Sequence, residues 1–108
     1  MLELWQTEWC PASRRVRERL TELGLDYVVR QVPVEKSERA ALRRAAGTDV
    51  IPALATGDGR AIVGEDAIRL YLDDHFTEPD GAAAHRTKAE TARRRYLEEE
   101  CECPPATH

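Results

Sequence analysis

Cysteine is scarce in this chain of 108 residues, where it occurs only as Cys10, Cys101 and Cys103. An odd number of widely spaced cysteines does not form the disulfide framework of a small secreted domain, so it favours a reducing compartment with one reactive thiol. The chain also lacks any run of about eighteen apolar residues, the length that a membrane-spanning helix needs. Its start, Met1-Leu2-Glu3-Leu4, has neither the basic nor the apolar segment of a signal peptide. We therefore expect a cytoplasmic protein without a membrane partner.

Lysine is also scarce: the chain contains only Lys36 and Lys88 but fourteen arginines. With 20 acidic residues the net charge is −4, which argues against a nucleic-acid partner held by phosphate contacts. The length suits a single domain, and a hydrophobic content of 42% is enough for one core of marginal size.

One stretch, Glu8-Trp9-Cys10-Pro11-Ala12-Ser13, joins an alternating apolar segment to an amphipathic helical pattern. The first N–H groups of a helix have no intrahelical partners and carry the positive end of its dipole. A cysteine at this junction has a lowered pKa and is a usable nucleophile near neutral pH. Pro11 suits the first helical position, where its missing N–H costs nothing. The alternative from this stretch alone is that Cys10 is a small buried apolar residue.

The apolar pattern predicts strands and helices that alternate along the first two thirds of the chain. Two strands joined by a helix are parallel and have a right-handed crossover. The turn Gly57-Asp58-Gly59-Arg60 predicts a hairpin, so the last two strands are antiparallel. The predicted strands cover residues 2–6, 27–32, 53–56 and 61–63, and the predicted helices cover residues 11–23, 37–46 and 65–76.

The helical run over residues 37–46 has a thin apolar face, because the side chains available for burial are mostly alanines. Gly47 follows it as the expected left-handed cap. We expect this helix to be the least stable part of the core. The residues available for burial are Ala41, Leu42, Ala45 and Ala46.

A proline opens the third predicted strand in the run Val50-Ile51-Pro52. Proline gives no donor to a sheet, so this strand lies at an edge or the Ile51–Pro52 bond is cis. Further on, Glu65 and Asp66 open the third helix after Gly64. They favour capping of the helix and interaction with its dipole. The same free N–H groups form an anion site in the alternative interpretation.

These segments resemble the motifs of one family. Cys10-Pro11-Ala12-Ser13 is similar to the Cys-Pro-x-Cys or Cys-Pro-x-Ser motif of glutaredoxins and thiol-type glutathione transferases. Val50-Ile51-Pro52 resembles the cis-proline element of thioredoxin-fold proteins, and residues 65–68 resemble the Glu-Ser-x-Ala-Ile stretch of glutathione transferases. The resemblance covers residues 1–76 and implies an α/β fold of the thioredoxin/glutaredoxin type. The expected order is β-α-β-α-β-β-α with a mixed four-stranded sheet, followed by an extra C-terminal helix.

The resemblance also implies roles for individual residues. Cys10 is the expected nucleophile, and Pro11 and Ser13 complete the catalytic motif. The backbone of Ile51 is expected to pair with the cysteinyl part of the bound thiol, and the Ile51–Pro52 bond is expected to be cis. Glu65 matches the family residue that faces a γ-glutamyl amino group, whereas Asp66 stands where the family usually has serine. The expected substrate-binding residues are Trp9, Ile51, Pro52, Glu65 and Asp66, and no metal is expected.

The function that the resemblance implies is monothiol exchange at Cys10. The co-substrate is glutathione or another low-molecular-weight γ-glutamyl thiol, and the partners are glutathionylated or disulfide-bearing proteins. One alternative is a transferase-like domain that acts on small electrophiles or only binds a thiol. Another is a monothiol glutaredoxin that holds a 2Fe–2S cluster between two copies. That group has Cys-Gly-Phe-Ser, from which Pro11 and Ala12 depart.

Residues 77–108 form a C-terminal loop, helix and irregular tail in this interpretation. The helix is expected over residues 82–100, with a thin stripe of Ala89, Ala92 and Tyr96 through which it docks weakly or forms a homodimer. Residues 1–76 are expected to fold without it. Cys101 and Cys103 lie in the tail as exposed thiols or a resolving thiol, because Cys-x-Cys lacks the second ligand pair of a zinc site.

Overall fold

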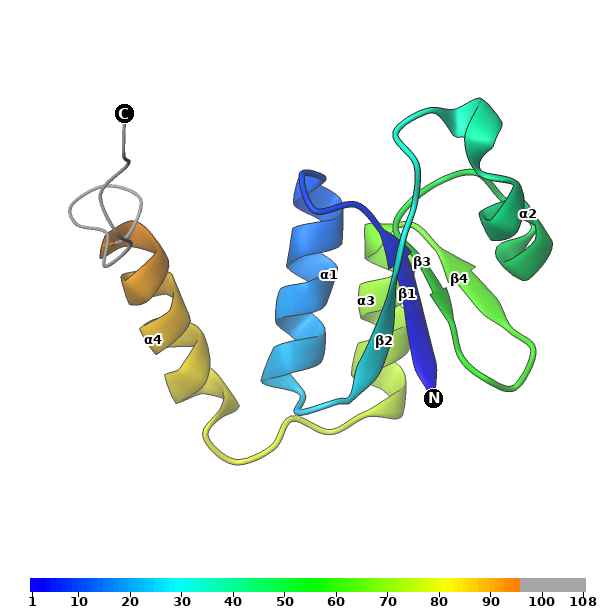
Figure 1. The fold of residues 1–108 in the computed structure, drawn as a ribbon. Coiled ribbons are helices and arrows are strands. Elements are labelled where there is room, and N and C mark those ends of the chain that lie inside the picture. The colour runs from blue at the N-terminus through cyan, green and yellow to red at the C-terminus, as the bar shows by residue number, and fades with distance from the viewer. Residues whose placement is uncertain (96–108) are drawn as a thin grey trace, which may run out of the picture. The chain divides into compact units, whose positions relative to one another are not determined.

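A computed structural model describes residues 1–95 of the chain, which divides into two compact units, Met1–Glu78 and Pro79–His108. The first unit has the predicted β-α-β-α-β-β-α order, and one further helix, α4 (Ala82–Arg94), belongs to the second unit (Figure 1). The predicted fold class is therefore confirmed. The elements of the first unit are β1 (Leu2–Gln6), α1 (Pro11–Glu22), β2 (Tyr27–Gln31), α2 (Ala40–Ala46), β3 (Ala53–Ala55), β4 (Ala61–Val63) and α3 (Glu65–His75).

The four strands form one mixed sheet in the order β2-β1-β3-β4. β1 and β2 are parallel, with Leu4 opposite Val29, whereas β3 is antiparallel to both β1 and β4. The carboxyl ends of β1, β2 and β4 and the amino end of β3 therefore meet at one end of the sheet. Figure 1 shows the starts of α1 and α3 at that same end. This topology brings together the segments around Cys10, Pro52 and Glu65.

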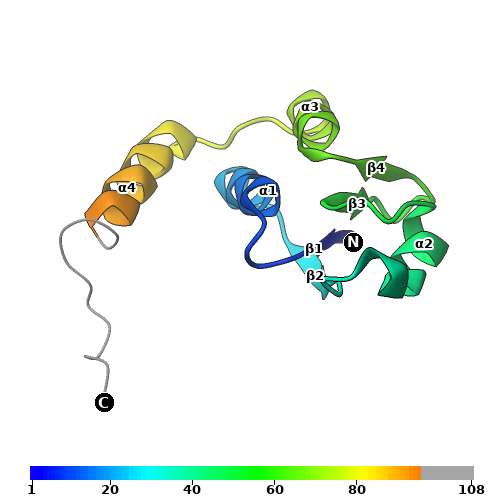
Figure 2. The ribbon, with the colours of Figure 1, turned by 90° about the horizontal axis from the view of Figure 1, so that it is seen from above.

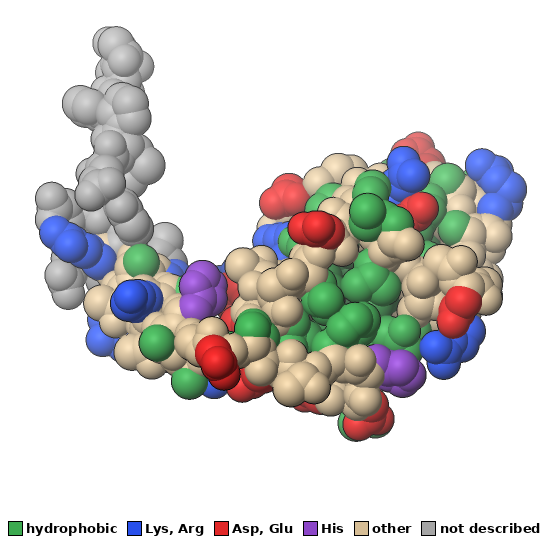
Figure 3. All heavy atoms as spheres, turned by 90° about the horizontal axis from the view of Figure 1, so that it is seen from below, with side chains coloured by type: hydrophobic (Ala, Val, Ile, Leu, Met, Phe, Trp, Pro, Cys, Tyr) green, Lys and Arg blue, Asp and Glu red, His purple; other side chains and the backbone are tan. Residues whose placement is uncertain are grey.

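Helices cover both faces of the sheet: α1 and α3 lie over one face and α2 over the other (Figure 2). The alternation along β1 follows from this arrangement, because Leu4 packs in the cluster under α1 and α3 while Trp5 packs in the cluster under α2. Viewed from the end opposite Cys10, hydrophobic side chains gather where β1 begins and α1 and α3 end (Figure 3). The buried members of the larger cluster are Leu4, Val16, Leu20, Leu23, Leu54, Ile68 and Leu72.

Arg19 joins α1 to α3 and to the segment that follows α3. Its guanidinium lies 2.8 Å from Glu22, 2.8 Å from Asp73 and 2.6 Å from Glu78. The side chain is only 13% exposed, so these carboxylates offset the cost of burying its charge. The ion pair with Arg19 ties Glu78, the last residue of the first unit, to α1.

The predicted helix over residues 37–46 is wrong in its first half. A short 3-10 turn, Lys36–Glu38, comes first, and Arg39 then breaks the chain with φ −91° and ψ 42° before α2 begins. Gly47 caps α2 in the left-handed conformation, as predicted. Side chains three or four apart share a helix face, and in this short helix the inner face is centred on Leu42 and Ala46. Leu42 is therefore buried and Ala46 half-buried, whereas Ala41 and Ala45 are exposed, contrary to the prediction.

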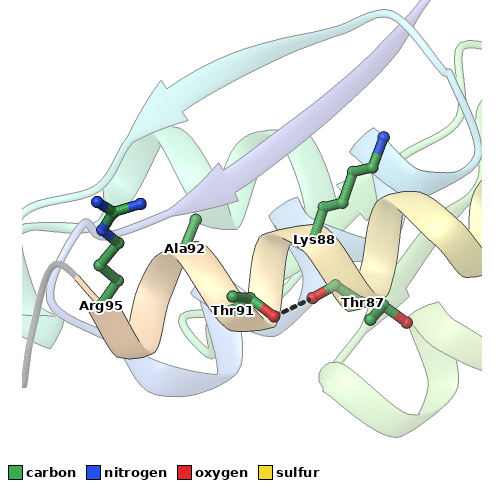
Figure 4. A pocket seen from close by; sticks show the side chains of 5 residues that line it. All are labelled: Thr87, Lys88, Thr91, Ala92 and Arg95. Carbon is green, nitrogen blue, oxygen red and sulfur yellow. Dashed lines mark hydrogen bonds between the residues drawn. The ribbon is translucent and has the colours of Figure 1, made fainter.

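In the second unit, α4 forms the described part of the helix predicted over residues 82–100. Ala89 is half-buried and Ala92 is exposed, while Tyr96, Cys101 and Cys103 lie outside the described residues. A shallow hollow of about 300 Å³ runs along this helix (Figure 4). Beside it the Thr91 hydroxyl donates to the Thr87 carbonyl over 3.0 Å, a bond within the helix itself. The lining residues are Thr87, Lys88, Thr91, Ala92 and Arg95.

None of the helices within residues 1–95 combines the length and apolar character that crossing a membrane requires.

Candidate functional site

Cys10 occupies the cap position of α1, as the sequence predicts. Its backbone is extended, with φ −75° and ψ 119°, and Pro11 is the first helical residue. The sulfur accepts a hydrogen bond from the Ser13 backbone N–H over 3.4 Å. The thiol is half-buried, so a disulfide can still reach it. The geometry places the sulfur against the free N–H groups and positive dipole end of α1.

The surroundings of Cys10 lower the pKa of its thiol. Burial raises the pKa, but the neighbouring Ser13 hydroxyl and the Ser13 and Ala12 N–H groups lower it, and so does the charge of Arg15. The Ser13 hydroxyl is fully buried and has no hydrogen-bond partner in the part of the chain that the structure describes. It is therefore free to donate to the thiolate form. The balance favours a thiolate at lower pH than in free cysteine.

We expect alkylation of Cys10 by iodoacetamide to reach half its maximal rate at a lower pH than alkylation of a free cysteine does, because the pKa of its thiol is lowered. Arg15→Gln should shift this midpoint upward because a stabilising charge is lost. Arg14→Gln is the matched control, since Arg14 is half exposed and pairs with Glu18. Mass spectrometry of the Cys10 peptide separates its reaction from those of the other cysteines. Equal shifts in the two variants would contradict a specific effect of Arg15.

The lowered thiol pKa also sets the sign of a stability effect. A group with a depressed folded-state pKa contributes stability above its unfolded pKa. That contribution is lost as the pH falls through the folded-state pKa of Cys10.

The Ile51–Pro52 bond is cis, so this prediction is confirmed. Pro52 is fully buried, and its carbonyl accepts a hydrogen bond from the Gly64 N–H over 2.9 Å. Ile51 is half-buried and packs against the cluster under α2. The start of β3 is thereby tied to the residue that precedes α3. The cis-proline segment and the acidic start of α3 are neighbours at the Cys10 end of the sheet.

Glu65 and Asp66 are the first two residues of α3, but neither caps the helix by a side-chain hydrogen bond. The cap residue is Gly64, whose φ of 93° suits glycine. Capping in that strict sense was therefore predicted wrongly, because the chain turns one residue earlier than the acidic pair. Both carboxylates remain in the first turn, where they interact favourably with the helix dipole.

An ion pair that the sequence did not predict joins Arg15 of α1 to Glu65. Arg15 Nε lies 2.7 Å from Glu65 Oε2, and Arg15 Nη2 lies 2.9 Å from Oε1. Arg69 adds a longer contact of 3.5 Å. The Arg15 hydrogen bond holds the pKa of Glu65 below its usual value, against the effect of burial. Bidentate pairing of this kind fixes the orientation of both side chains.

Arg15 interacts electrostatically with both the Cys10 thiol and the acidic pair, Glu65 and Asp66. Its pKa is raised chiefly by the hydrogen bond to Glu65, and the negative charges of Cys10 and Asp66 raise it further. Arg15 therefore contacts Glu65 directly and interacts electrostatically with Cys10 and Asp66. Asp66 is exposed. Trp9, which precedes Cys10 in the chain, has 62% of its surface exposed.

A buried polar network supports the loop that precedes Cys10. The side chain of Gln6 is fully buried and donates to Glu8 over 2.9 Å and to Gln31 over 3.1 Å. Arg17 donates to the Gln6 side-chain oxygen and to the Thr7 carbonyl. The pKa of Glu8 is lowered by its hydrogen bonds from Gln31 and Gln6. The sequence held a signal for this network, because Gln6 occupies an inward position of the alternating strand β1. A buried amide needs hydrogen-bond partners, so polar side chains were to be expected around it.

Within residues 1–95 no group of three or more histidine, cysteine, aspartate or glutamate side chains is arranged to hold a metal ion. Cys101 and Cys103, the cysteines considered above for a zinc site, lie outside the described residues.

The chain that carries this site matches the model of a known domain. The family model for the glutathione S-transferase N-terminal domain matches residues 4–80. The chain belongs to this family. A search of the curated proteins found no match to this chain.

Solved structures share the fold. A glutathione S-transferase from Rhodospirillum rubrum F11 is 28% identical, with a TM-score of 0.62, over 92% of this chain and 46% of that one. A buckwheat glutaredoxin–glutathione complex is 25% identical, with a TM-score of 0.56, over 68% of each chain. Rice GST1 in complex with glutathione is 24% identical, with a TM-score of 0.61, over 88% of this chain and 43% of that one. The chain thus spans just under half the length of the two transferases.

Proposed function

We propose that this glutathione S-transferase N-terminal domain acts as a monothiol thiol–disulfide oxidoreductase on mixed disulfides of glutathione or a related γ-glutamyl thiol. The observation that carries the proposal is the half-buried Cys10 thiol at the cap of α1, with its lowered pKa. The cis Ile51–Pro52 segment and the Arg15–Glu65 pair at the same end of the sheet support it. A single reactive thiol suits the cytoplasm, where small thiols are kept reduced.

In the proposed reaction the Cys10 thiolate attacks the glutathione sulfur of a mixed disulfide. The new sulfur–sulfur bond joins Cys10 to glutathione, and the old one breaks to release the partner as a thiolate, which takes a proton from water. A second glutathione thiolate then attacks the glutathione sulfur on Cys10. This step releases glutathione disulfide and restores the Cys10 thiolate. Ser13 cannot form an internal disulfide, so it acts as a hydrogen-bond donor to the thiolate.

The remaining residues bind the γ-glutamyl thiol in this proposal. The backbone of Ile51 pairs with the cysteinyl part, and Pro52 and Trp9 flank it. Glu65 receives the ligand ammonium while Arg15 keeps its carboxylate ionised and oriented. Asp66 places a second negative charge near the ligand carboxylate, which weakens that contact. The free N–H groups of the first turn of α3 still donate to the carboxylate.

Opposite effects are therefore expected at two adjacent positions. Glu65→Gln should weaken glutathione binding by about tenfold, since a charge-assisted contact is lost. Asp66→Ser should strengthen it by about threefold, because it removes a like charge beside the ligand carboxylate. Calorimetric titration with glutathione in a Cys10→Ser background measures both without covalent reaction. If both variants bind glutathione as tightly as the parent protein does, the acidic pair does not bind the ligand and only interacts with the dipole of α3.

A transferase-like activity is the second candidate, favoured by the match of residues 4–80 to the transferase domain. Its test is the rate at which glutathione is conjugated to a small aryl halide. Conjugation without disulfide turnover would replace the oxidoreductase by a transferase, and binding without either reaction would leave a thiol-binding domain. A brown protein with visible absorbance would instead indicate a bound iron–sulfur cluster.

A further inference from the structure

Arg39 is a buried cation that no carboxylate neutralises among the described residues. It is 4% exposed and stands at the break between the 3-10 turn and α2. Each of its three guanidinium nitrogens donates to a backbone carbonyl. Nε donates to Pro33 over 2.8 Å, Nη1 donates to Asp49 over 2.8 Å and Nη2 donates to Val34 over 2.9 Å. These bonds satisfy the buried guanidinium with neutral partners.

The three carbonyls belong to two loops that are distant in the sequence. Pro33 and Val34 follow β2, whereas Asp49 precedes β3 and lies two residues before Ile51. Both loops are at the end of the sheet where Cys10 lies, because β2 ends there and β3 starts there. The planar guanidinium fork bonds three diverging carbonyls at once, which a lysine ammonium on its flexible stem does poorly. Arg39 therefore ties the two loops and the start of α2 into one unit.

We propose that Arg39 is a positioning residue that holds the segment from Asp49 to Pro52 in place for thiol binding. This inference rests on the proposed function, in which the Ile51 backbone pairs with the bound thiol. The end of the segment is also held by the Gly64 N–H, which donates to the Pro52 carbonyl, whereas at its start the side chain of Asp49 makes only a long ion pair of 3.9 Å with Arg43. Val50 is exposed, and its N–H is bonded only to the nearby Thr48 hydroxyl among the described residues. Loss of Arg39 leaves three carbonyls without their donor and lets the segment move.

The role of Arg39 separates from the reactivity of the thiol. The main influences on the pKa of Cys10 are burial, Ser13, Ala12 and the charge of Arg15, and Arg39 is not among them. An Arg39 variant should therefore bind the γ-glutamyl thiol weakly while its cysteine keeps a normal alkylation profile. A general loss of structure would change both.

The test compares Arg39→Gln, Arg39→Lys and Arg44→Gln. Arg44→Gln is the matched control, since Arg44 is an exposed arginine of α2 and its replacement removes the same charge. Amide hydrogen exchange of residues 48–51, glutathione affinity by calorimetry and the pH profile of Cys10 alkylation are measured for each. For Arg39→Gln we expect exchange over residues 48–51 to accelerate and the Kd for glutathione to rise, each by about tenfold. The alkylation midpoint should stay unchanged, Arg39→Lys should be intermediate and Arg44→Gln should match the parent.

Other outcomes overturn the inference in distinct ways. Unchanged exchange over residues 48–51 means that Arg39 does not hold the segment. If exchange accelerates equally in β1 and α1, Arg39 stabilises the whole fold and does not hold this segment in particular. In that case, parent-like exchange in Arg39→Lys would show that a positive charge alone is enough for this stabilisation. Faster local exchange with unchanged glutathione affinity removes the link to binding. If the parent protein binds no glutathione, the proposed function fails and the positioning role fails with it, while exchange still reports whether the loops are tied.

Discussion

Replacing Cys10 with serine is expected to lower turnover of a glutathione mixed disulfide by on the order of a thousandfold or more. The serine hydroxyl stays protonated at neutral pH and does not form the sulfur–sulfur bond on which the exchange depends. The surrounding fold should be preserved, because serine is of similar size and suits a helix cap. Glutathione disulfide released from a small mixed disulfide, separated by chromatography, is the measurement.

Two further variants make this result specific. Ser13→Ala keeps the sulfur and removes the buried hydroxyl, so it should retain turnover and raise the pKa of Cys10. Replacing both Cys101 and Cys103 with serine should leave turnover intact if one thiol is enough. Loss of activity in this double variant, or substantial activity in Cys10→Ser, would show that the single-thiol mechanism is incorrect.

Leu20→Ala is expected to lower the free energy of unfolding by about 2–5 kcal/mol, the usual range for emptying a well-packed leucine site. Leu20 is fully buried on α1 in the cluster that also contains Leu4, Leu54 and Ile68. A small domain has roughly 5–15 kcal/mol of stability to lose. The change should therefore move the unfolding midpoint strongly. Urea unfolding followed by circular dichroism measures it.

Leu70→Ala is the matched control for this prediction. The same atoms are removed from α3, but Leu70 is 63% exposed and makes no part of the buried cluster. Substitutions at such positions usually change stability by no more than about 0.5 kcal/mol. A similar loss in both variants would mean that Leu20 is not packed as the structure places it.

Elements with strong local signals were predicted to the residue or nearly so. β1 has the predicted bounds because Leu2 and Leu4 alternate with polar residues, and β4 follows a hairpin turn marked by Asp58-Gly59. The junction at Cys10 was predicted because Pro11 suits the first position of a helix and an amphipathic pattern follows it. The start of α2 was predicted wrongly because the local pattern has no sign that Arg39 turns inward.

Arg39 shows why that error has a physical cause. Arg39 follows Ser37 and Glu38 and precedes Ala40, and these local neighbours favour an exposed position in a helix. In the folded chain its guanidinium finds three free carbonyls on two loops, and the backbone bends at Arg39 to reach them. Local propensity is worth tenths of a kcal/mol, whereas several charge-assisted hydrogen bonds are worth about 1–3 kcal/mol each.

The sequence by itself determined the order of the elements and the place of Cys10 at the start of α1, because each depends on residues that are adjacent in the chain. The cis Ile51–Pro52 bond was predicted from the resemblance to thioredoxin-fold proteins. Only the tertiary structure decided which charges meet around the thiol. Arg15 and Glu65 are 50 positions apart, and no local pattern distinguishes Arg15 from its neighbour Arg14, which pairs within its own helix. Their orientation follows from the packing of α1 against α3 through Leu20 and Ile68. Side-chain pairing across that interface is decided by where the buried faces of the two helices meet.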